Sequence, residues 1–229
     1  MKNEKILGLV CCGLLLVGCG GGTSSTNPSS CEIDPTNIQP KDINLTAAIN
    51  DNNIRGYSDA TTLEGKYVAV INYLRSMKIQ CQDPSCIVGP SESNMTWNED
   101  LADAAKEHSD DMALSIYYNG NHTGSGTEND ITGQSFTSPR KSEFYERIKF
   151  NNYNGTLTAE NIAKSVANYE ISEDTWLSIV EGWMNSEHGH CSNIMNPELT
   201  NIGMYETRAE KDENGTYRVY WTQDFGKPQ

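Results

Sequence analysis

The sequence predicts an α+β fold, because helical periodicity precedes a pair of strand-like segments at the C-terminal end. Apolar residues recur at steps of three and four in several stretches between residues 62 and 186. Residues 201–209 and 216–226 are instead rich in β-branched and aromatic residues, and Asn214-Gly215 between them favours a tight turn. Helices followed by such a hairpin indicate a layered domain with an antiparallel sheet.

The N-terminal residues predict export and a lipid anchor. Lys2 and Lys5 precede an apolar run, residues 6–17, which is the length of a signal peptide and too short to span a bilayer. The run ends in Leu16-Val17-Gly18-Cys19, which resembles a bacterial lipobox. That resemblance implies that residues 1–18 are a lipoprotein signal peptide and that Cys19 is acylated. The alternative is an ordinary secretory peptide that is cleaved in the following Gly/Ser stretch.

The lipobox determines where the protein is expected. Acyl chains on Cys19 would hold it at a membrane as a cell-envelope lipoprotein without a transmembrane helix. Gly20 follows the cysteine, and the absence of Asp there favours the outer membrane or cell surface over the inner membrane. Residues 19–30 are a Gly/Ser-rich tether, and residues 31–61 are predicted to be an extended arm.

The charge balance argues against one class of partner. The chain carries a formal net charge of −14 at pH 7, and removal of the basic signal peptide makes it slightly more negative. Binding to nucleic acid depends on Lys and Arg side chains that neutralise phosphates. We therefore expect no nucleic-acid partner.

Cysteine usage agrees with an oxidising compartment. Three of the seven cysteines lie in the signal peptide and lipobox, which leaves Cys31, Cys81, Cys86 and Cys191. Four cysteines allow three pairings. We favour Cys81–Cys191 with Cys31–Cys86, and the second choice is Cys81–Cys86 with Cys31–Cys191. Although Cys191 follows His190, a structural disulfide is a better interpretation than a nucleophilic thiolate.

Four helices are expected before the hairpin, because each of four segments places apolar residues on one helical face. They are residues 62–78, a segment after Trp97, one that starts at Ser142 and one that starts at Ser172. We expect Ser142 to be the N-cap of the third helix. The Asn-, Gly- and Thr-rich residues 151–158 are a candidate for a further strand.

Several short stretches occur in an order that resembles the CAP superfamily: the cysteine-rich secretory, antigen 5 and pathogenesis-related 1 proteins, whose domain is also called SCP. The stretches are TWNEDLADAAKEHSDDMA, NHTGSGT, FYERI, AENIA, GHCSNIMNP, NIGM and YWTQDFG. The likeness covers roughly residues 64–226 and is greatest to bacterial single-domain members. It implies a three-layer α-β-α sandwich over residues 62–229, with a cleft lined by histidines and acids.

The resemblance also identifies candidate site residues. His122 matches the first cavity histidine, Glu160 matches the acid of the GENIA-type motif, and His190 matches the histidine of GHCSNI. Two neutral imidazoles and a carboxylate can hold Zn²⁺ with one position left open. They can also act as acid, base and orienting group around a water molecule. His122 and His190 are therefore candidate metal ligands, with His188 and Glu160 as further candidates, whereas His108 is expected to be a hydrogen-bonded core histidine.

The chain departs from the family pattern at several positions. Ala159 stands where the GENIA-type motif has glycine, and Ser186 stands where animal and plant members have a second cavity acid. Tyr220 and Trp221 precede Thr-Gln where those members have a histidine. The two-histidine, two-acid set is therefore incomplete, while His188 adds an imidazole next to the GHC motif.

Two functions from different classes remain. We favour a binding module in the cell envelope that takes a small ligand, a lipid, a divalent metal such as Zn²⁺, or a protein partner. The alternative is a hydrolase, with or without a metal, that acts on a peptide or envelope substrate through His122, Glu160 and His190. The chain has no G-x-S-x-G motif that would mark a serine nucleophile. Binding is therefore preferred over catalysis.

Overall fold

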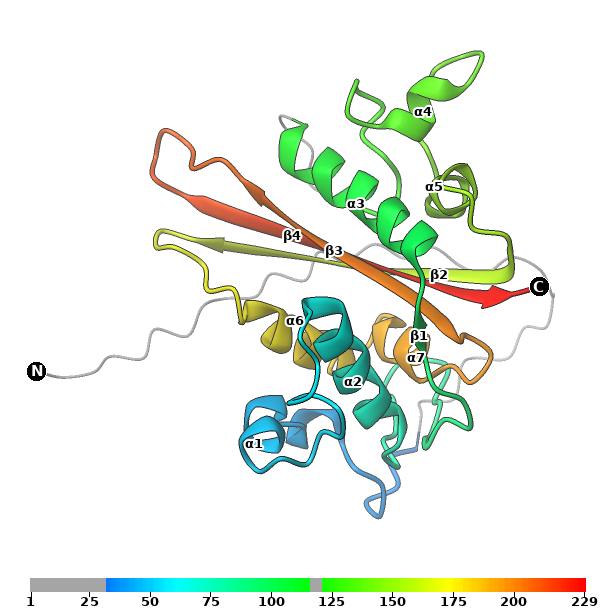
Figure 1. Ribbon diagram of the computed structural model, residues 1–229, viewed down its shortest axis with the longest axis vertical. Coiled ribbons are helices and arrows are strands. Elements are labelled where there is room, and N and C mark those ends of the chain that lie inside the picture. The colour runs from blue at the N-terminus through cyan, green and yellow to red at the C-terminus, as the bar shows by residue number, and fades with distance from the viewer. Residues whose placement is uncertain (1–31, 116–120) are drawn as a thin grey trace, which may run out of the picture.

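A four-stranded sheet forms the middle layer of the molecule, which is described here from a computed structural model of residues 32–115 and 121–229 (Figure 1). The strands follow the order β1-β3-β4-β2. Strand β1 runs parallel to β3, and the other neighbours are antiparallel. Their bounds are Thr96–Trp97 for β1, Gly155–Ala167 for β2, Asn201–Ala209 for β3 and Tyr217–Pro228 for β4. The predicted hairpin is thus confirmed, and the candidate strand at 151–158 begins at Gly155 and continues through AENIA.

Helices cover both faces of this sheet, as expected for an α-β-α sandwich (Figure 1). One layer, here called the apolar layer, consists of η1, α1, α2, α6 and α7. The other, here called the polar layer, consists of α3, α4 and α5. Their bounds are η1 Pro40–Asp42, α1 Leu45–Asn50, α2 Leu63–Arg75, α3 Glu99–Leu114, α4 Ile131–Ser135, α5 Phe144–Phe150, α6 Thr175–Met184 and α7 His190–Met195.

Most of the hydrophobic core lies between the sheet and the apolar layer. Ile71 of α2 and Trp183 of α6 are buried against Trp221 and Phe225 of β4. The apolar residues of α2 and α6 recur at helical spacing, and those of β4 recur at alternate positions. They therefore meet when the helices pack on the sheet. The helical faces that the sequence predicted around residues 62–78 and after Ser172 are therefore confirmed.

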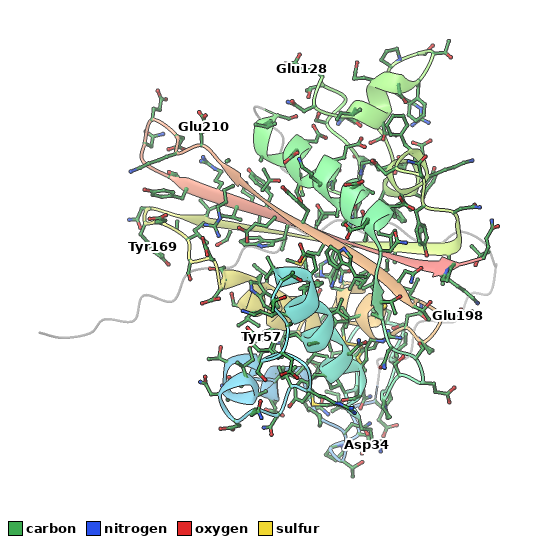
Figure 2. The ribbon with its side chains drawn as sticks, in the orientation of Figure 1. Asp34, Tyr57, Glu128, Tyr169, Glu198 and Glu210 are labelled. Carbon is green, nitrogen blue, oxygen red and sulfur yellow. A yellow bond between two sulfur atoms is a disulfide. The ribbon has the colours of Figure 1, made fainter. Side chains whose placement is uncertain are left out.

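The polar layer packs closely on the sheet but has a much smaller apolar cluster. That cluster consists of Leu101, Ala104, Ile148 and Tyr153. Helix α3 approaches β3 so closely that a Cβ on Gly203 would lie 2.1 Å from the backbone nitrogen of Ala102. Only glycine fits at that contact. Figure 2 shows the side chains that fill both interlayer spaces, with Glu198 and Glu210 near opposite ends of the sheet.

The N-terminal arm differs from the prediction. Residues 31–61 were expected to be extended, but the described part contains η1 and α1, and Leu45 and Ile54 are buried in the main core. The backbone nitrogen of Leu45 donates a hydrogen bond to Glu181 Oε1 at 2.7 Å. The arm contains few apolar residues, and those few become ordered because they meet α6, which lies more than a hundred residues away in the sequence.

Two predicted helix starts are also corrected. Helix α5 is capped by Glu143 in a capping box with Glu146, whereas the backbone nitrogen of Ser142 donates to Asp130 at 3.0 Å. The fourth helix begins at Thr175 rather than at Ser172. In both cases the helix begins a few residues later than predicted. Errors of this size are common when helix boundaries are inferred from sequence.

The favoured disulfide Cys81–Cys191 is confirmed, with a Cα–Cα distance of 5.6 Å. Cys86 is also disulfide-bonded. Its expected partner Cys31, the lipobox Cys19 and the predicted signal peptide and tether lie outside the described residues. Within residues 32–115 and 121–229, no helix is both long enough and apolar enough to cross a membrane.

Candidate functional site

The candidate site centres on a hydrogen bond between His122 and Glu160. His122 lies in the loop that follows α3, and Glu160 lies in the middle of β2. His122 Nδ1 is 2.8 Å from Glu160 Oε1. The His122 side chain is 25% exposed and the Glu160 side chain is 1% exposed, so the pair extends from the surface into the interior. Since Nδ1 binds the carboxylate, Nε2 is the ring nitrogen left to meet a ligand.

Arg147 of α5 holds this pair from inside the polar layer. Its Nη2 donates to Glu160 Oε2 at 2.8 Å and to the backbone oxygen of His122 at 3.0 Å, and its side chain is 1% exposed. Arg147 therefore fixes both the acid and the backbone of the histidine. Nothing in its local sequence pattern indicated this role, although the FYERI stretch that contains it contributed to the family resemblance.

Glu160 is ionised in this environment. Burial by itself would raise the pKa of the Glu160 carboxyl, but the positive charge of Arg147 and the hydrogen bond from His122 outweigh it and lower the pKa to about 2. The carboxylate can therefore orient the His122 ring and stabilise an added positive charge on it. This is the arrangement in which a carboxylate tunes an imidazole for proton transfer or for hydrogen bonding to a ligand.

His108 has the structural role predicted from its helix face. It is fully buried in α3, and its Nε2 lies 2.7 Å from the backbone oxygen of Asn121. Burial and the nearby Arg147 charge lower the pKa of His108 to about 3, so the ring is neutral. Because a carbonyl oxygen only accepts, Nε2 is the protonated nitrogen, and it supports the loop that carries His122.

His190 approaches the site from the opposite layer. It is the first residue of α7 and is only 9% exposed, and its Nδ1 is buried without a hydrogen-bond partner among the described residues. Burial, followed by the charges of His122 and His188, lowers the pKa of His190 to about 4. His190 is therefore a neutral imidazole within electrostatic reach of His122. No hydrogen bond joins it to the His122–Glu160 pair in the described part of the chain.

An amide network connects α7 to the strand that carries Glu160. Asn161 Nδ2 donates to the backbone oxygen of His190 at 3.2 Å and to Gln223 Oε1 at 2.8 Å. Asn193 Nδ2 donates to Asn161 Oδ1 at 2.8 Å and to the backbone oxygen of Glu160 at 3.3 Å. The asparagine of AENIA and the glutamine of YWTQDFG thus position the site instead of forming its surface.

The disulfide and a buried acid hold the first turn of α7. Cys81–Cys191 joins this turn to the loop after α2, and Asp83, 1% exposed, accepts from the backbone nitrogen of Ser192 at 3.0 Å. His190 precedes the bonded cysteine. Its backbone position is therefore determined by contacts from the loop and from β2.

The described residues form no cluster for the expected metal. Among them, His122, Glu160, His188 and His190 included, no three His, Cys, Asp or Glu side chains stand close enough to hold a metal ion. Both Glu160 oxygens already bind His122 and Arg147. A dication at Glu160 would also lie beside the buried Arg147 charge, which opposes binding. The metal role predicted for His122 and His190, with His188 and Glu160 as further candidates, has no support in this geometry, and we assign no metal to the site.

A surface hollow of about 260 Å³ opens near the site, between α5 and the first part of β2. Tyr145, Lys149 and Tyr153 line it together with residues 155–158. Thr158 is two positions from Glu160, so it points to the same face of β2 at a distance of about 7 Å along the strand. His122, Glu160 and His190 are not part of its lining, so the hollow is a neighbour of the site on the α5 side of the sheet.

Comparisons with known proteins agree with the sequence resemblance. A family model described as "CAP: Cysteine-rich secretory protein family" matches residues 68–225. Among solved structures, the chain is similar to an extracellular protein containing a SCP domain from Bacillus anthracis str. Ames, with 22% identity and a TM-score of 0.43. That match covers 70% of this chain and 38% of the other, so the chain spans well under half of that protein's length. No curated protein matches the chain.

Proposed function

Because the chain belongs to the cysteine-rich secretory protein family, CAP, we propose that it is a lipid-anchored binding module of the cell envelope. Its site would take a small polar ligand at His122. The observation that carries this proposal is the His122–Glu160 pair, which buries an ionised carboxylate and leaves the imidazole partly exposed. A ligand that donates a hydrogen bond to Nε2 gains from the negative charge behind the ring.

The second imidazole supports the same proposal. His190 is neutral and nearly buried, and its Nδ1 lacks a hydrogen-bond partner among the described residues. A buried polar atom without a partner has a desolvation cost that a ligand group can remove. The hollow beside Thr158 adds tyrosine and threonine side chains and one lysine, which suits a polar ligand better than a hydrocarbon chain.

Binding is tested most directly by comparing two histidines near the site. The purified protein is titrated calorimetrically with peptidoglycan fragments, short peptides and phospholipid micelles, as wild type, His122→Ala and His188→Ala. His188 is the matched control, because it is exposed and its charge acts on His190, while its ring makes no hydrogen bond with the residues that the structure describes. We expect at least one probe to bind, with about tenfold weaker affinity in His122→Ala, which corresponds to loss of one charge-assisted hydrogen bond.

Two outcomes would contradict a binding role at His122: no probe binds, or both variants bind as well as wild type. The same samples test the alternative, hydrolysis, in which His122 Nε2 removes a proton from an attacking water and Glu160 stabilises the imidazolium. The observation in its favour is the same histidine–carboxylate pair. Mass spectrometry that finds cleaved probes with wild type and intact probes with His122→Ala would replace binding by hydrolysis.

The lipid anchor is a separate part of the proposal, and the lipobox sequence supports it. The disulfide Cys81–Cys191 agrees with an oxidising compartment outside the cytoplasm. We expect the wild-type protein to sediment with membranes of its bacterial host and Cys19→Ala to lose that association, since Cys19 is the expected acylated residue. If Cys19→Ala stays with the membranes while peripheral proteins are washed off, the anchor lies elsewhere.

A further inference from the structure

Behind Glu160 lies a second buried acid, Asp224, which belongs to the YWTQDFG stretch but has no role in the proposed function. The two residues face each other across the antiparallel pair β2–β4. Directly opposed side chains point to the same face of a sheet. Glu160 contacts Arg147 of the polar layer, so Asp224 points there too, and its exposure is 0%.

Asp224 has no donor to stabilise a negative charge. Neither of its carboxyl oxygens accepts a hydrogen bond from a donor group among the described residues, and the side chain close enough to share a hydrogen bond with it is Glu160, which is itself a carboxyl. Arg147 is the cation nearby, but its Nη groups donate to Glu160, to the backbone oxygen of His122 and to Ser142. An ionised carboxylate without donors or its own counter-ion costs several kcal/mol in a protein interior.

The charges that face Asp224 come from three elements. They are Glu160 of β2, Arg147 of α5, and Glu107 of α3, with the neutral His108 beside them. One arginine therefore faces three carboxyl groups, and Glu160 holds its charged hydrogen bond. A like charge directly across the strand pair disfavours ionisation of Asp224, as in carboxyl pairs that share a single proton.

We propose that Asp224 carries a proton at neutral pH and is a positioning residue for the His122–Glu160 pair. In the neutral form it places no second negative charge beside Glu160 and does not compete for Arg147. Arg147 can then hold Glu160 and the His122 backbone together. The meaning of this proton for ligand binding rests on the proposed function, whereas the proton itself can be measured without any ligand.

The pKa shifts agree with this assignment. Burial raises the pKa of Asp224 well above its usual range, the charge of Glu160 raises it further, and Arg147 only partly opposes these effects. The pKa of Glu160 moves in the opposite direction, to about 2. Two adjacent carboxyl groups whose pKa values are driven apart in this way share one proton between them.

The test compares wild type with Asp224→Asn, which has the shape of a protonated aspartate but cannot ionise. Urea unfolding is measured from pH 5 to pH 7. The folded wild type holds one proton that the unfolded chain has released, so its folding constant should fall with rising pH about tenfold per unit more steeply than that of the variant. The ratio of the two folding constants, variant over wild type, should therefore rise with pH.

Asp130→Asn is the matched control, because Asp130 is also a buried aspartate but accepts hydrogen bonds from the backbone nitrogens of Gly126, Gly133 and Ser142. Although burial opposes it, these bonds lower the pKa of Asp130. Because the pKa of Asp130 is lowered, this residue is ionised in both the folded and the unfolded chain from pH 5 to pH 7. The ratio for Asp130→Asn should therefore stay constant across that range. A ratio for Asp224→Asn that does not change with pH would overturn the proposal.

A second measurement does not depend on the variant folding. Infrared spectra of the wild type at pH 7 should contain the carbonyl stretch of a protonated carboxylic acid, and this band should disappear when urea unfolds the chain. If the folded protein shows no such band at pH 7, Asp224 is ionised and the proposal is wrong. Both measurements are made on unliganded protein, so failure of the binding proposal would not affect them.

Discussion

The two faces of the sheet are packed by different means. On the apolar layer, α2, α6 and α7 bury a continuous cluster that includes Trp183 and Trp221. On the polar layer, a small cluster of four buried apolar residues lies beside a group of buried polar and charged side chains that contains Arg147, Glu160 and Asp224. The candidate site lies at the edge strand β2, where both layers meet.

This difference predicts how the stability of each layer responds to pH. Burial of apolar surface is non-directional and does not depend on the state of a proton. Buried charges contribute stability only when each has its partner, and they respond to pH. We therefore expect substitutions in the apolar layer to cost stability equally at all pH values, whereas those in the polar layer should show a pH dependence that identifies the group involved.

The largest effect is expected from Trp183→Ala in the apolar layer. Trp183 is 1% exposed, and its Nε1 donates to the backbone oxygen of Ile162 at 3.0 Å. The cavity and the lost bond should lower the free energy of unfolding by about 4 kcal/mol. Urea unfolding at pH 4 and pH 7 should give the same loss. A loss of unfolding free energy that varies strongly between these pH values would contradict the proposed difference between the layers.

A somewhat smaller effect, about 3 kcal/mol at pH 7, is expected from Arg147→Met, because it leaves Glu160 as a buried charge without its cation. With Arg147 present, the pKa of Glu160 is about 2, below its usual value of 4.5. The stability that this shift contributes is present above pH 4.5 and is lost as pH falls toward 2. The difference between wild type and variant should therefore narrow in acid, and urea unfolding between pH 2.5 and pH 7 measures it. A constant difference would mean that Arg147 acts only through packing.

The smallest effect on stability is expected from Asp224→Asn, and its sign distinguishes it from Arg147→Met. Asparagine replaces a neutral acid of nearly the same shape, so the variant should be close to wild type at pH 5 and relatively more stable as pH rises. Two neighbours in one buried cluster would then show opposite pH trends, which packing by itself cannot produce. The urea series described above for this variant measures that difference.

Elements with strong local signals were predicted well. The apolar stripes of α2, α3 and α6 and the hairpin β3–β4 follow from helical and strand periodicity. The sequence missed α1 and the short helices α4 and α7, because helices of five or six residues show too little periodicity and depend on tertiary contacts. It also misplaced the cap of α5, where Glu143 rather than Ser142 meets Glu146.

The site was predicted in part. His122 and Glu160 are joined by a hydrogen bond, and the charge of His122 lowers the pKa of His190. The described residues contain no metal-binding cluster, so the metal role predicted for His122 and His190, with His188 and Glu160, has no support there. Arg147 explains why the described residues form no metal cluster around Glu160, because it occupies one of the two carboxylate oxygens. A His/Glu set is compatible with metal binding or with an ion pair, and the identity of the third partner decides between them. Nothing in the local pattern of FYERI indicated that partner.

The sequence by itself determined what depends on neighbours along the chain: the main helices, the hairpin, the four cysteines after the lipobox and the candidate histidines. Only the tertiary structure decided which carboxyl groups are charged. Glu160 and Asp224 are both acids on strands, yet one pKa is lowered and the other is raised. The reason is physical: burial raises both pKa values, but the hydrogen bonds of Arg147 and His122 go to Glu160, and packing α5 against the sheet brings Arg147 there.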